Sequence, residues 1–287
     1  MRKSNSKLGI TLMLIGMFTF SAVDTVAKFL TDTFHPVQII WFRQLGLLGG
    51  VAILLLLKGP GILRTKRLPM QVGRGVLAIC SALLFVFAVK YAPLADVVAA
   101  TFVAPFFLTI LGALVLGERV GLHRWSAVLV GFIGALIIIR PGLGTIHPAV
   151  MLAVLAAFVY AVRQVIGRLL SDTDPTITTI AYTAIVGSCI ISVPLPLVWQ
   201  TPVSGFQIAL LVVMAVLAAV GEVLVIKALE VAEAVVVAPM HYTLIIWGTL
   251  YGYFVFHQLP DRWTWLGTAI IIVAGLYTLQ RERRLKH

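Results

Sequence analysis

Charged residues are scarce in this sequence of 287 residues. Asp, Glu, Lys and Arg together make up 11% of it, whereas an average soluble protein contains about 25%. Hydrophobic residues account for 60%, and the mean hydropathy is +1.04. This composition excludes a soluble globular domain. It predicts an all-α integral membrane protein, because a bilayer core requires about 20 apolar residues for each helix that crosses it.

Motifs that would indicate catalysis, a cofactor or a metal are also missing. No G-x-x-x-x-G-K-[ST] sequence indicates a nucleotide-binding motor, and no H-E-x-x-H sequence or His/Cys cluster indicates a metal site. The two cysteines, Cys80 and Cys189, each lie in an apolar run, so we expect them to be small core residues. The sequence therefore predicts no cofactor, no metal site and no enzyme activity.

Positive charge is in excess, with a formal net charge of +11. This charge does not predict nucleic acid binding, because most basic residues lie in short loops between apolar runs. With a cytoplasmic N-terminus, most of them, including Arg74, fall on predicted cytoplasmic flanks. The predicted outer flanks contain only Lys28, Lys90, Arg140 and Arg262. The positive-inside rule then places both termini in the cytoplasm.

One stretch near the N-terminus occurs a second time in the middle of the chain. The segment from Leu8 to Asp32, LGITLMLIGMFTFSAVDTVAKFLTD, aligns with a segment that begins at Pro148, PAVMLAVLAAFVYAVRQVIGRLLSD. The matched positions are Phe20 and Tyr160, Asp24 and Gln164, Lys28 and Arg168, and Asp32 and Asp172. A chain that repeats at half its length is built from two copies of one unit, which we place at residues 8–141 and 148–280.

Apolar periodicity, interrupted by Pro and Gly, divides the chain into ten predicted transmembrane helices. The predicted helices cover residues 8–30, 37–57, 71–91, 94–116, 124–140, 148–169, 176–198, 206–228, 233–256 and 262–280. The first continues through Asp24 and Lys28 without a signal-peptide cleavage site, so we expect it to be retained. Each copy holds five helices, and this odd number inserts the second copy in the inverted orientation.

Three segments carry a resemblance to a known family. They are LADVVAATFVAPFFLTILGALVLGERVGLHRWSAVLVGFIGALIIIRPG (Leu94–Gly142), VDTVAKFLTDTFHPVQIIWFRQ (Val23–Gln44) and EVAEAVVVAPMHYTLIIWGTLYGYFVF (Glu230–Phe256). Their order over two halves resembles the EamA family of the drug/metabolite transporter superfamily. The resemblance implies ten spans in inverted five-span repeats around a central cavity. It also implies that the fourth and ninth spans line this cavity, while the fifth and tenth lie at the periphery. One departure is His257-Gln258, which stands where the first copy has Gly117-Glu118.

Within this family, the chain is most similar to bacterial members that handle S-adenosylmethionine or riboflavin. The resemblance implies a secondary transporter that moves such a small organic metabolite across the inner membrane by alternating access. An exporter of amino acids, drugs or a metallophore is the alternative, and a membrane-embedded enzyme or a channel is more remote. The lipid bilayer and the small-molecule substrate are the expected partners. Transport direction, coupling ion and oligomeric state, a homodimer included, stay open.

Four charged residues lie well inside the predicted spans, away from the span ends. A charge at the centre of a bilayer costs about 2.5–3.5 kcal/mol on insertion scales, so each requires a partner or a water-filled cavity. Asp24 and Arg43 fall in the outer third of the membrane, and Arg163 and Glu222 fall in the cytoplasmic third. Opposite signs at equal depth predict one ion pair on each side of the midplane. These pairs either gate the two mouths and hold charged parts of a substrate, or fix helix packing.

One face of the sixth predicted span is polar. Tyr160, Arg163, Gln164 and Gly167 are spaced at i, i+3, i+4 and i+7 and therefore share this face. We interpret it as a wall of the substrate path, with interhelical hydrogen bonding as the alternative. Lys28, in the first copy, is expected to reach the outer surface and pair with Asp24 at i, i+4.

The ninth predicted span brings titratable and aromatic residues together. His241, Tyr242 and Trp247 would suit a flat ring or a cation in a substrate, although Tyr and Trp also serve as membrane-interface anchors. His241 is the only histidine well inside a predicted span, so it is either a proton-coupling group or a hydrogen-bonded structural residue. Asp24, Glu222 and His241 are the candidates for proton coupling, and facilitated diffusion is an equal alternative.

Overall fold

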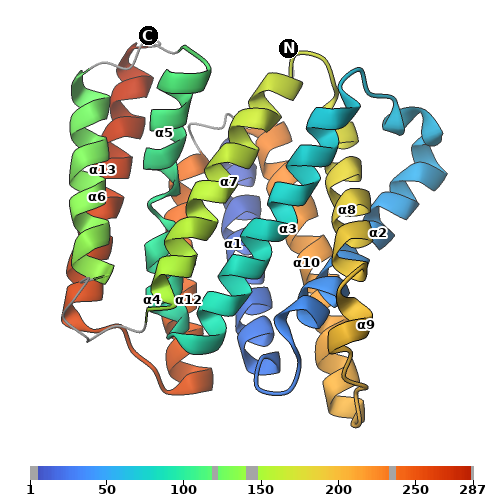
Figure 1. Ribbon diagram of the computed structural model, residues 1–287. Coiled ribbons are helices and arrows are strands. Elements are labelled where there is room, and N and C mark those ends of the chain that lie inside the picture. The colour runs from blue at the N-terminus through green and yellow to red at the C-terminus, as the bar shows by residue number, and fades with distance from the viewer. Residues whose placement is uncertain (1–5, 118–121, 140–147, 233–236, 286–287) are drawn as a thin grey trace.

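The computed structural model describes residues 6–117, 122–139, 148–232 and 237–285, and every regular element within these ranges is a helix (Figure 1). The predicted all-α class is therefore confirmed. The helices are α1 (Ser6–Leu30), α2 (Pro36–Lys58), η1 (Pro60–Leu63), α3 (Leu68–Tyr91), α4 (Leu94–Thr101), α5 (Ala104–Val115), α6 (Leu122–Ile139), α7 (Val150–Leu170), α8 (Thr176–Ser192), α9 (Leu195–Val198), α10 (Gly205–Val231), η2 (Ala238–Tyr242), α12 (Thr243–Phe256) and α13 (Arg262–Leu285). Glu118 and Arg140 lie outside the described residues.

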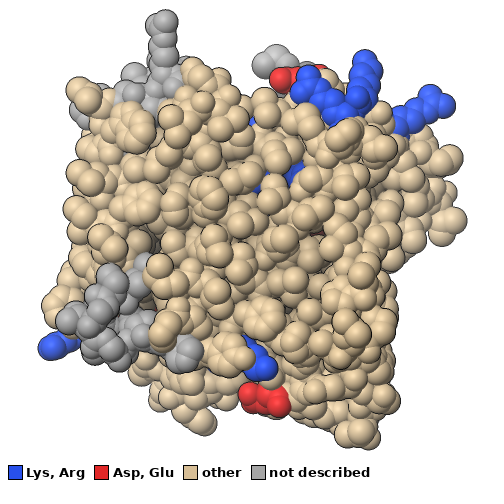
Figure 2. Space-filling model, in the orientation of Figure 1, with Lys and Arg blue, Asp and Glu red and all other residues tan. Residues whose placement is uncertain are grey.

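The lengths and the surface of these helices are those of a multi-pass membrane protein. Among the described residues, six helical segments are long and apolar enough to cross a bilayer: Lys7–Leu30, Pro36–Lys58, Leu68–Tyr91, Leu94–Val115, Val150–Leu170 and Gly205–Ala228. Many large apolar side chains point outward, and Leu56 is 87% exposed. Figure 2 shows the resulting tan band between ends that carry most of the charged side chains. Cys80 and Cys189 belong to this outer surface, so the expectation that they are core residues is wrong.

Three of the predicted spans are not continuous helices. The span predicted at 94–116 is interrupted between α4 and α5, because Pro105 has no backbone N–H to donate to the carbonyl of Thr101. The span predicted at 233–256 contains the 3₁₀ helix η2, which also has a proline in its first turn, before α12 begins. The span predicted at 176–198 is α8 and the short α9, separated at Val193-Pro194.

Contacts between the helices give their relative directions. Ser81 of α3 donates a hydrogen bond to the carbonyl of Ala156 in α7, and Arg74, nearer the start of α3, lies against Gly167, nearer the end of α7. These two helices are therefore antiparallel. The ammonium group of Lys28, at the end of α1, contacts the end of α3, so α1 and α3 finish at the same side of the protein. It follows that α1 and α7 run in opposite directions (Figure 1).

The packing partners follow a regular pattern. α1 packs along α10 and α7 packs along α3, while α2 packs on α10 and α8 packs on α3. α6 and α13 pair at one edge of the bundle (Figure 1). Their backbones approach closely at two glycines, because a Cβ added to Gly267 would lie 2.5 Å from the carbonyl oxygen of Gly134. Small residues thus allow this outer pair to pack tightly.

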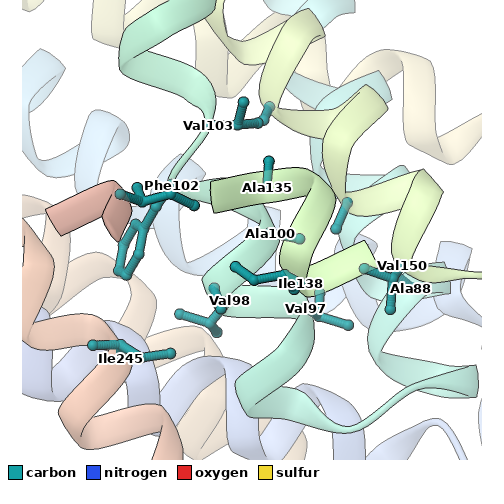
Figure 3. Close-up of a cluster of buried hydrophobic side chains, with 14 of the residues drawn as sticks. Ala88, Val97, Val98, Ala100, Phe102, Val103, Ala135, Ile138, Val150 and Ile245 are labelled. Carbon is teal, nitrogen blue, oxygen red and sulfur yellow. The ribbon is translucent and has the colours of Figure 1, made fainter. Parts of the chain in front are cut away.

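The largest apolar core surrounds the interruption between α4 and α5. Phe102 and Val103 lie at this interruption, and Ala135 and Ile138 of α6 pack nearby (Figure 3). Ile245 of α12 belongs to the same cluster. The break in the fourth predicted span therefore packs beside α12, which belongs to the ninth.

Candidate functional site

Asp24 of α1 and Arg43 of α2 form the ion pair that their charges and positions predicted. Arg43 Nη1 lies 3.8 Å from Asp24 Oδ1, and the two side chains are 23% and 14% exposed. A short turn joins the two helices, and His35 caps the start of α2 by accepting a hydrogen bond from the backbone N–H of Val37. Burial, and then the charge of Lys90, lower the pKa of His35, which favours the neutral ring that this cap requires. A gating role for the pair stays a prediction.

Arg163 of α7 and Glu222 of α10 do not form the second expected pair. Among the described residues, no carboxylate lies within 4 Å of the Arg163 guanidinium, and no cation lies within 4 Å of the Glu222 carboxylate. A third charged residue, Arg74 of α3, interacts electrostatically with both. The polar cluster therefore has two arginines and one glutamate rather than one residue of each sign.

Arg74 was assigned to the cytoplasmic flank by charge counting, and the structure places it in the helix bundle. Its Nη1 donates a hydrogen bond to the hydroxyl of Thr183 in α8. A Cβ added to Gly167 would lie 3.1 Å from Arg74 Nε, so the guanidinium lies against the bare backbone of α7. The Arg74 Nε–H is buried and has no acceptor in the described part of the chain. The sequence signal that could have found Arg74 is Pro69, because proline favours the first turn of a helix and would have started α3 earlier.

The polar face of α7 is assembled as its spacing predicted. Gln164 Nε2 donates to the hydroxyl of Tyr160 over 3.1 Å, and the Arg163 guanidinium carbon lies 5.1 Å from the centre of the Tyr160 ring. The Nε–H of Arg163 is buried without an acceptor. Tyr160 itself is 37% exposed. Figure 2 shows a few atoms of Lys or Arg side chains within the tan band. They lie where α3 and α7 run side by side in Figure 1.

The residues singled out in the ninth predicted span lie in η2 and α12. His241 is exposed in η2. The Tyr242 ring packs edge-on against Phe102 at 5.4 Å between centroids, within the largest apolar cluster. Trp247 packs against Phe18 of α1 at 5.1 Å, and its indole N–H is buried without an acceptor. Tyr242 and Trp247 therefore pack against aromatic rings of different helical segments.

A charged side chain contacts each end of α3. Lys28 was expected to contact Asp24, and Asp174 was not singled out from the sequence. Lys28 Nζ donates to the carbonyls of Val89 and Ala92 at 2.8 and 2.6 Å, so the expected pairing with Asp24 is wrong. The last carbonyls of a helix have no intrahelical donors and carry partial negative charge, which attracts an ammonium group. At the other end, the Asp174 carboxylate accepts a 2.7 Å hydrogen bond from Gln71 Nε2.

Asp174 lies in the loop after α7, outside the membrane-spanning segments. The hydrogen bond from the Thr65 hydroxyl lowers the pKa of Asp174 below its ordinary value, with further contributions from Gln71, the backbone N–H of Lys66 and Thr173. Burial of the carboxyl acts in the opposite direction. The anion therefore complements the N-terminal, partially positive end of α3.

These features define a helical protein that crosses the membrane several times and holds charged and polar groups between its helices, as solute carriers do. The chain belongs to the EamA-like transporter family, whose pattern matches residues 7–140 and again residues 147–279. It is thus a transporter of a small organic metabolite. The described residues contain no group of three or more His, Cys, Asp or Glu that could hold a metal ion.

Three curated relatives carry transporter names. The chain is 31% identical to the riboflavin transporter of Vibrio cholerae, over 96% of this chain and 94% of the relative. It is 28% identical to the S-adenosylmethionine uptake transporter of Rickettsia prowazekii, with the same coverage of both chains. It is also 28% identical to the pseudopaline exporter CntI of Pseudomonas aeruginosa, over 97% of this chain and 98% of the relative. A solved crystal structure with 16% identity matches 98% of both chains with a TM-score of 0.67, which supports the fold.

Proposed function

We propose that the chain is a secondary transporter that works by alternating access between two inverted five-span halves, residues 8–141 and 148–280. The opposite directions of α1 and α7, which the repeat makes equivalent, support the inversion. The packing of α1 on α10 and of α7 on α3 supports it as well, because the two contacts exchange equivalent helices. The family pattern matches each half separately.

Both termini are cytoplasmic in this proposal, and the membrane is the bacterial inner membrane. Figure 1 marks the two ends of the chain at the same end of the bundle. In Figure 2, basic side chains gather at that end on the face shown. The positive-inside rule assigns such an end to the cytoplasm.

The observation that carries the proposal is a polar contact between the two halves. Arg74 belongs to the first half. It donates a hydrogen bond to Thr183 and interacts electrostatically with Arg163 and Glu222, and all three belong to the second half. A rocking motion of one half against the other must change this contact, and a bound solute can shift the equilibrium only through a contact that differs between states. The residues to which we assign substrate binding or gating are Asp24, Arg43, Tyr160, Arg163, Gln164, Glu222, His241, Tyr242 and Trp247, and the structure adds Arg74.

The substrate is a small metabolite of the kind that its relatives' names indicate, with riboflavin and S-adenosylmethionine as the first candidates. Asp24, Glu222 and His241 are the candidates for proton coupling, and facilitated diffusion is the alternative. The test is uptake into proteoliposomes that contain the purified full-length protein. The panel contains riboflavin, S-adenosylmethionine and amino acids, each measured with and without a proton gradient.

A carrier gives saturable uptake and counterflow, in which unlabelled solute inside the vesicle accelerates entry of labelled solute. A channel shows neither property, and an enzyme would alter the solute chemically. Uptake that rises linearly with concentration, without counterflow, would overturn the proposal. Dependence of the rate on the proton gradient distinguishes coupled transport from facilitated diffusion.

Export is the second candidate function. The similarity to the pseudopaline exporter extends over 97% of this chain, which is as long as the similarity to the uptake transporters. The same vesicles, loaded with the solute and diluted into solute-free buffer at opposite proton gradients, measure the direction that the gradient favours. Efflux of the solute that is driven by an inwardly directed proton gradient would favour an exporter.

A further inference from the structure

The charges of the polar cluster between α3, α7 and α10 do not balance. Two guanidinium groups, Arg74 and Arg163, are accompanied by one carboxylate, Glu222. The remaining partners, the Thr183 hydroxyl and the Tyr160 ring, are neutral. An uncompensated charge inside a membrane protein is costly, so an anion that enters this cluster would be stabilised there.

The unused donors of the two arginines are of the kind that binds a carboxylate. The Nε–H groups of Arg74 and Arg163 are both buried and have no acceptor among the described residues. Guanidinium groups bind the two oxygens of a carboxylate through paired N–H donors, and Nε–H commonly forms one of each pair. Because Arg74 crosses α7 at Gly167, one helical turn after Arg163, both guanidiniums approach the same face of that helix.

The same cluster also offers a carboxylate, Glu222, to a cationic group of a solute. The half-buried Glu222 carboxylate interacts with Arg74 electrostatically, yet no cation lies within 4 Å of it among the residues that the structure describes. Two guanidiniums and one carboxylate that interact electrostatically without direct contact complement a molecule that carries a carboxylate next to an ammonium group. Tyr160, which is exposed, and Gln164, which is half-buried, lie on the same helical face as Arg163.

We infer that the cluster of Arg74, Arg163 and Glu222 binds the α-amino carboxylate group of a zwitterionic solute, with the arginines on the carboxylate and the glutamate on the ammonium. This inference rests on the proposed function and narrows its substrate. S-adenosylmethionine carries an α-amino carboxylate group, whereas riboflavin carries neither charged group. The site therefore selects the first of these two candidates.

The test compares three solutes in proteoliposomes that contain the full-length protein. S-adenosylmethionine has both groups of the α-amino carboxylate, and its decarboxylated analogue has lost the carboxylate but keeps the ammonium. Both compounds also carry the sulfonium cation, so they differ in the carboxylate alone, whereas riboflavin has none of these charges. The expected result is saturable uptake of S-adenosylmethionine, with the decarboxylated analogue and riboflavin weaker competitors. A hydrogen-bonded ion contact corresponds to about 10- to 150-fold in affinity, which sets the expected loss on removing the carboxylate.

Variants of the cluster residues test whether the cluster distinguishes S-adenosylmethionine from its decarboxylated analogue. Arg163→Gln is expected to raise the KM for S-adenosylmethionine about 10-fold or more while leaving competition by the decarboxylated analogue nearly unchanged. Glu222→Gln is expected to weaken binding of both compounds, because both have the ammonium group. Arg168→Gln, an exposed arginine later in the same helix, is the matched control and should behave as the wild type. Arg163→Lys keeps the charge, so it serves where the glutamine variant fails to fold, and its single point charge should restore only part of the discrimination.

The outcomes separate this inference from the proposed function. Saturable uptake of riboflavin, or of the decarboxylated analogue at the same KM as S-adenosylmethionine, would leave the transporter assignment intact and overturn the inference. An equal loss of apparent affinity for S-adenosylmethionine and for its decarboxylated analogue in Arg163→Gln would overturn it too, because it would indicate a structural role. Absence of saturable uptake for every solute in the proposed panel would overturn both.

Discussion

Removal of both partners of the Asp24–Arg43 pair should destabilise the protein less than the sum of the two single removals. The two side chains are 14% and 23% exposed, so the charge that remains after Asp24→Asn or Arg43→Gln stays largely out of water. Loss of one partner from a buried pair costs about 3–5 kcal/mol, and the residual exposure favours the lower end of this range, about 3 kcal/mol. The double variant leaves no unpaired charge, so we expect it to recover about 1–3 kcal/mol relative to the sum of the single losses.

The assay is the free energy of unfolding in detergent, measured for both single variants and for the double variant. Lys227 and Glu230 provide the control, because their atoms are closer, at 2.7 Å, but their side chains are 58% and 46% exposed. Lys227→Gln should therefore cost at most about 1 kcal/mol. If the losses from Asp24→Asn and Arg43→Gln were simply additive, the reasoning from burial would be refuted.

Transport by the double variant tests what the pair does. If the pair opens and closes during transport, the double variant should keep the wild-type fold at a lower stability and move its solute more slowly. Full transport by a well-folded double variant would make the pair a static packing contact.

Three further predictions concern the helix contacts. Gly46→Ala should destabilise the protein by about 1–3 kcal/mol in chemical unfolding, because its Cβ would lie 1.9 Å from the carbonyl oxygen of Ala215, whereas Gly50→Ala, with nothing within 4 Å, should not. Lys28→Met should lower the free energy of unfolding by about 2–3 kcal/mol, because it removes the ammonium donor from two carbonyls at the end of α3. In thermal unfolding, Asp174→Asn should destabilise the protein at pH 7 but progressively less below about pH 4. A carboxylate whose pKa is lowered in the folded state stabilises the fold at any pH above its unfolded-state pKa. It loses this effect as the pH falls through its folded-state pKa.

Each of these predictions has an outcome that contradicts it. Equal effects of alanine at Gly46 and Gly50 would mean that helix propensity, rather than the close approach of α2 and α10, decides the result. A Lys28→Met variant as stable as the wild type would mean that water satisfies the two carbonyls equally well. A loss in Asp174→Asn that is the same at pH 3 and pH 7 would assign the effect to the shape of the side chain and not to its charge.

The bounds of the helices were largely predictable from the sequence. The prediction of 37–57 for α2 agrees closely with Pro36–Lys58, because a proline starts the helix and Gly59 ends it. The Asp24–Arg43 pair was predictable as well, because a single short turn separates its two helices. The polar face of α7 follows from spacing within one helix. In each case the relevant free energies depend on residues that are near each other along the chain.

Contacts between distant helices could not be predicted in this way. Arg74 counted as a flanking charge until the packing of α3 on α7 and α8 brought it to Gly167 and Thr183. Lys28 has the acidic neighbour that helical spacing provides, yet the free carbonyls of another helix are its partners. The sequence by itself determined that the chain is apolar and helical, since hydropathy and turn chemistry are local. Only the tertiary structure decided which charges meet, because the faces that two helices present to each other are selected by side-chain packing between segments far apart in the chain.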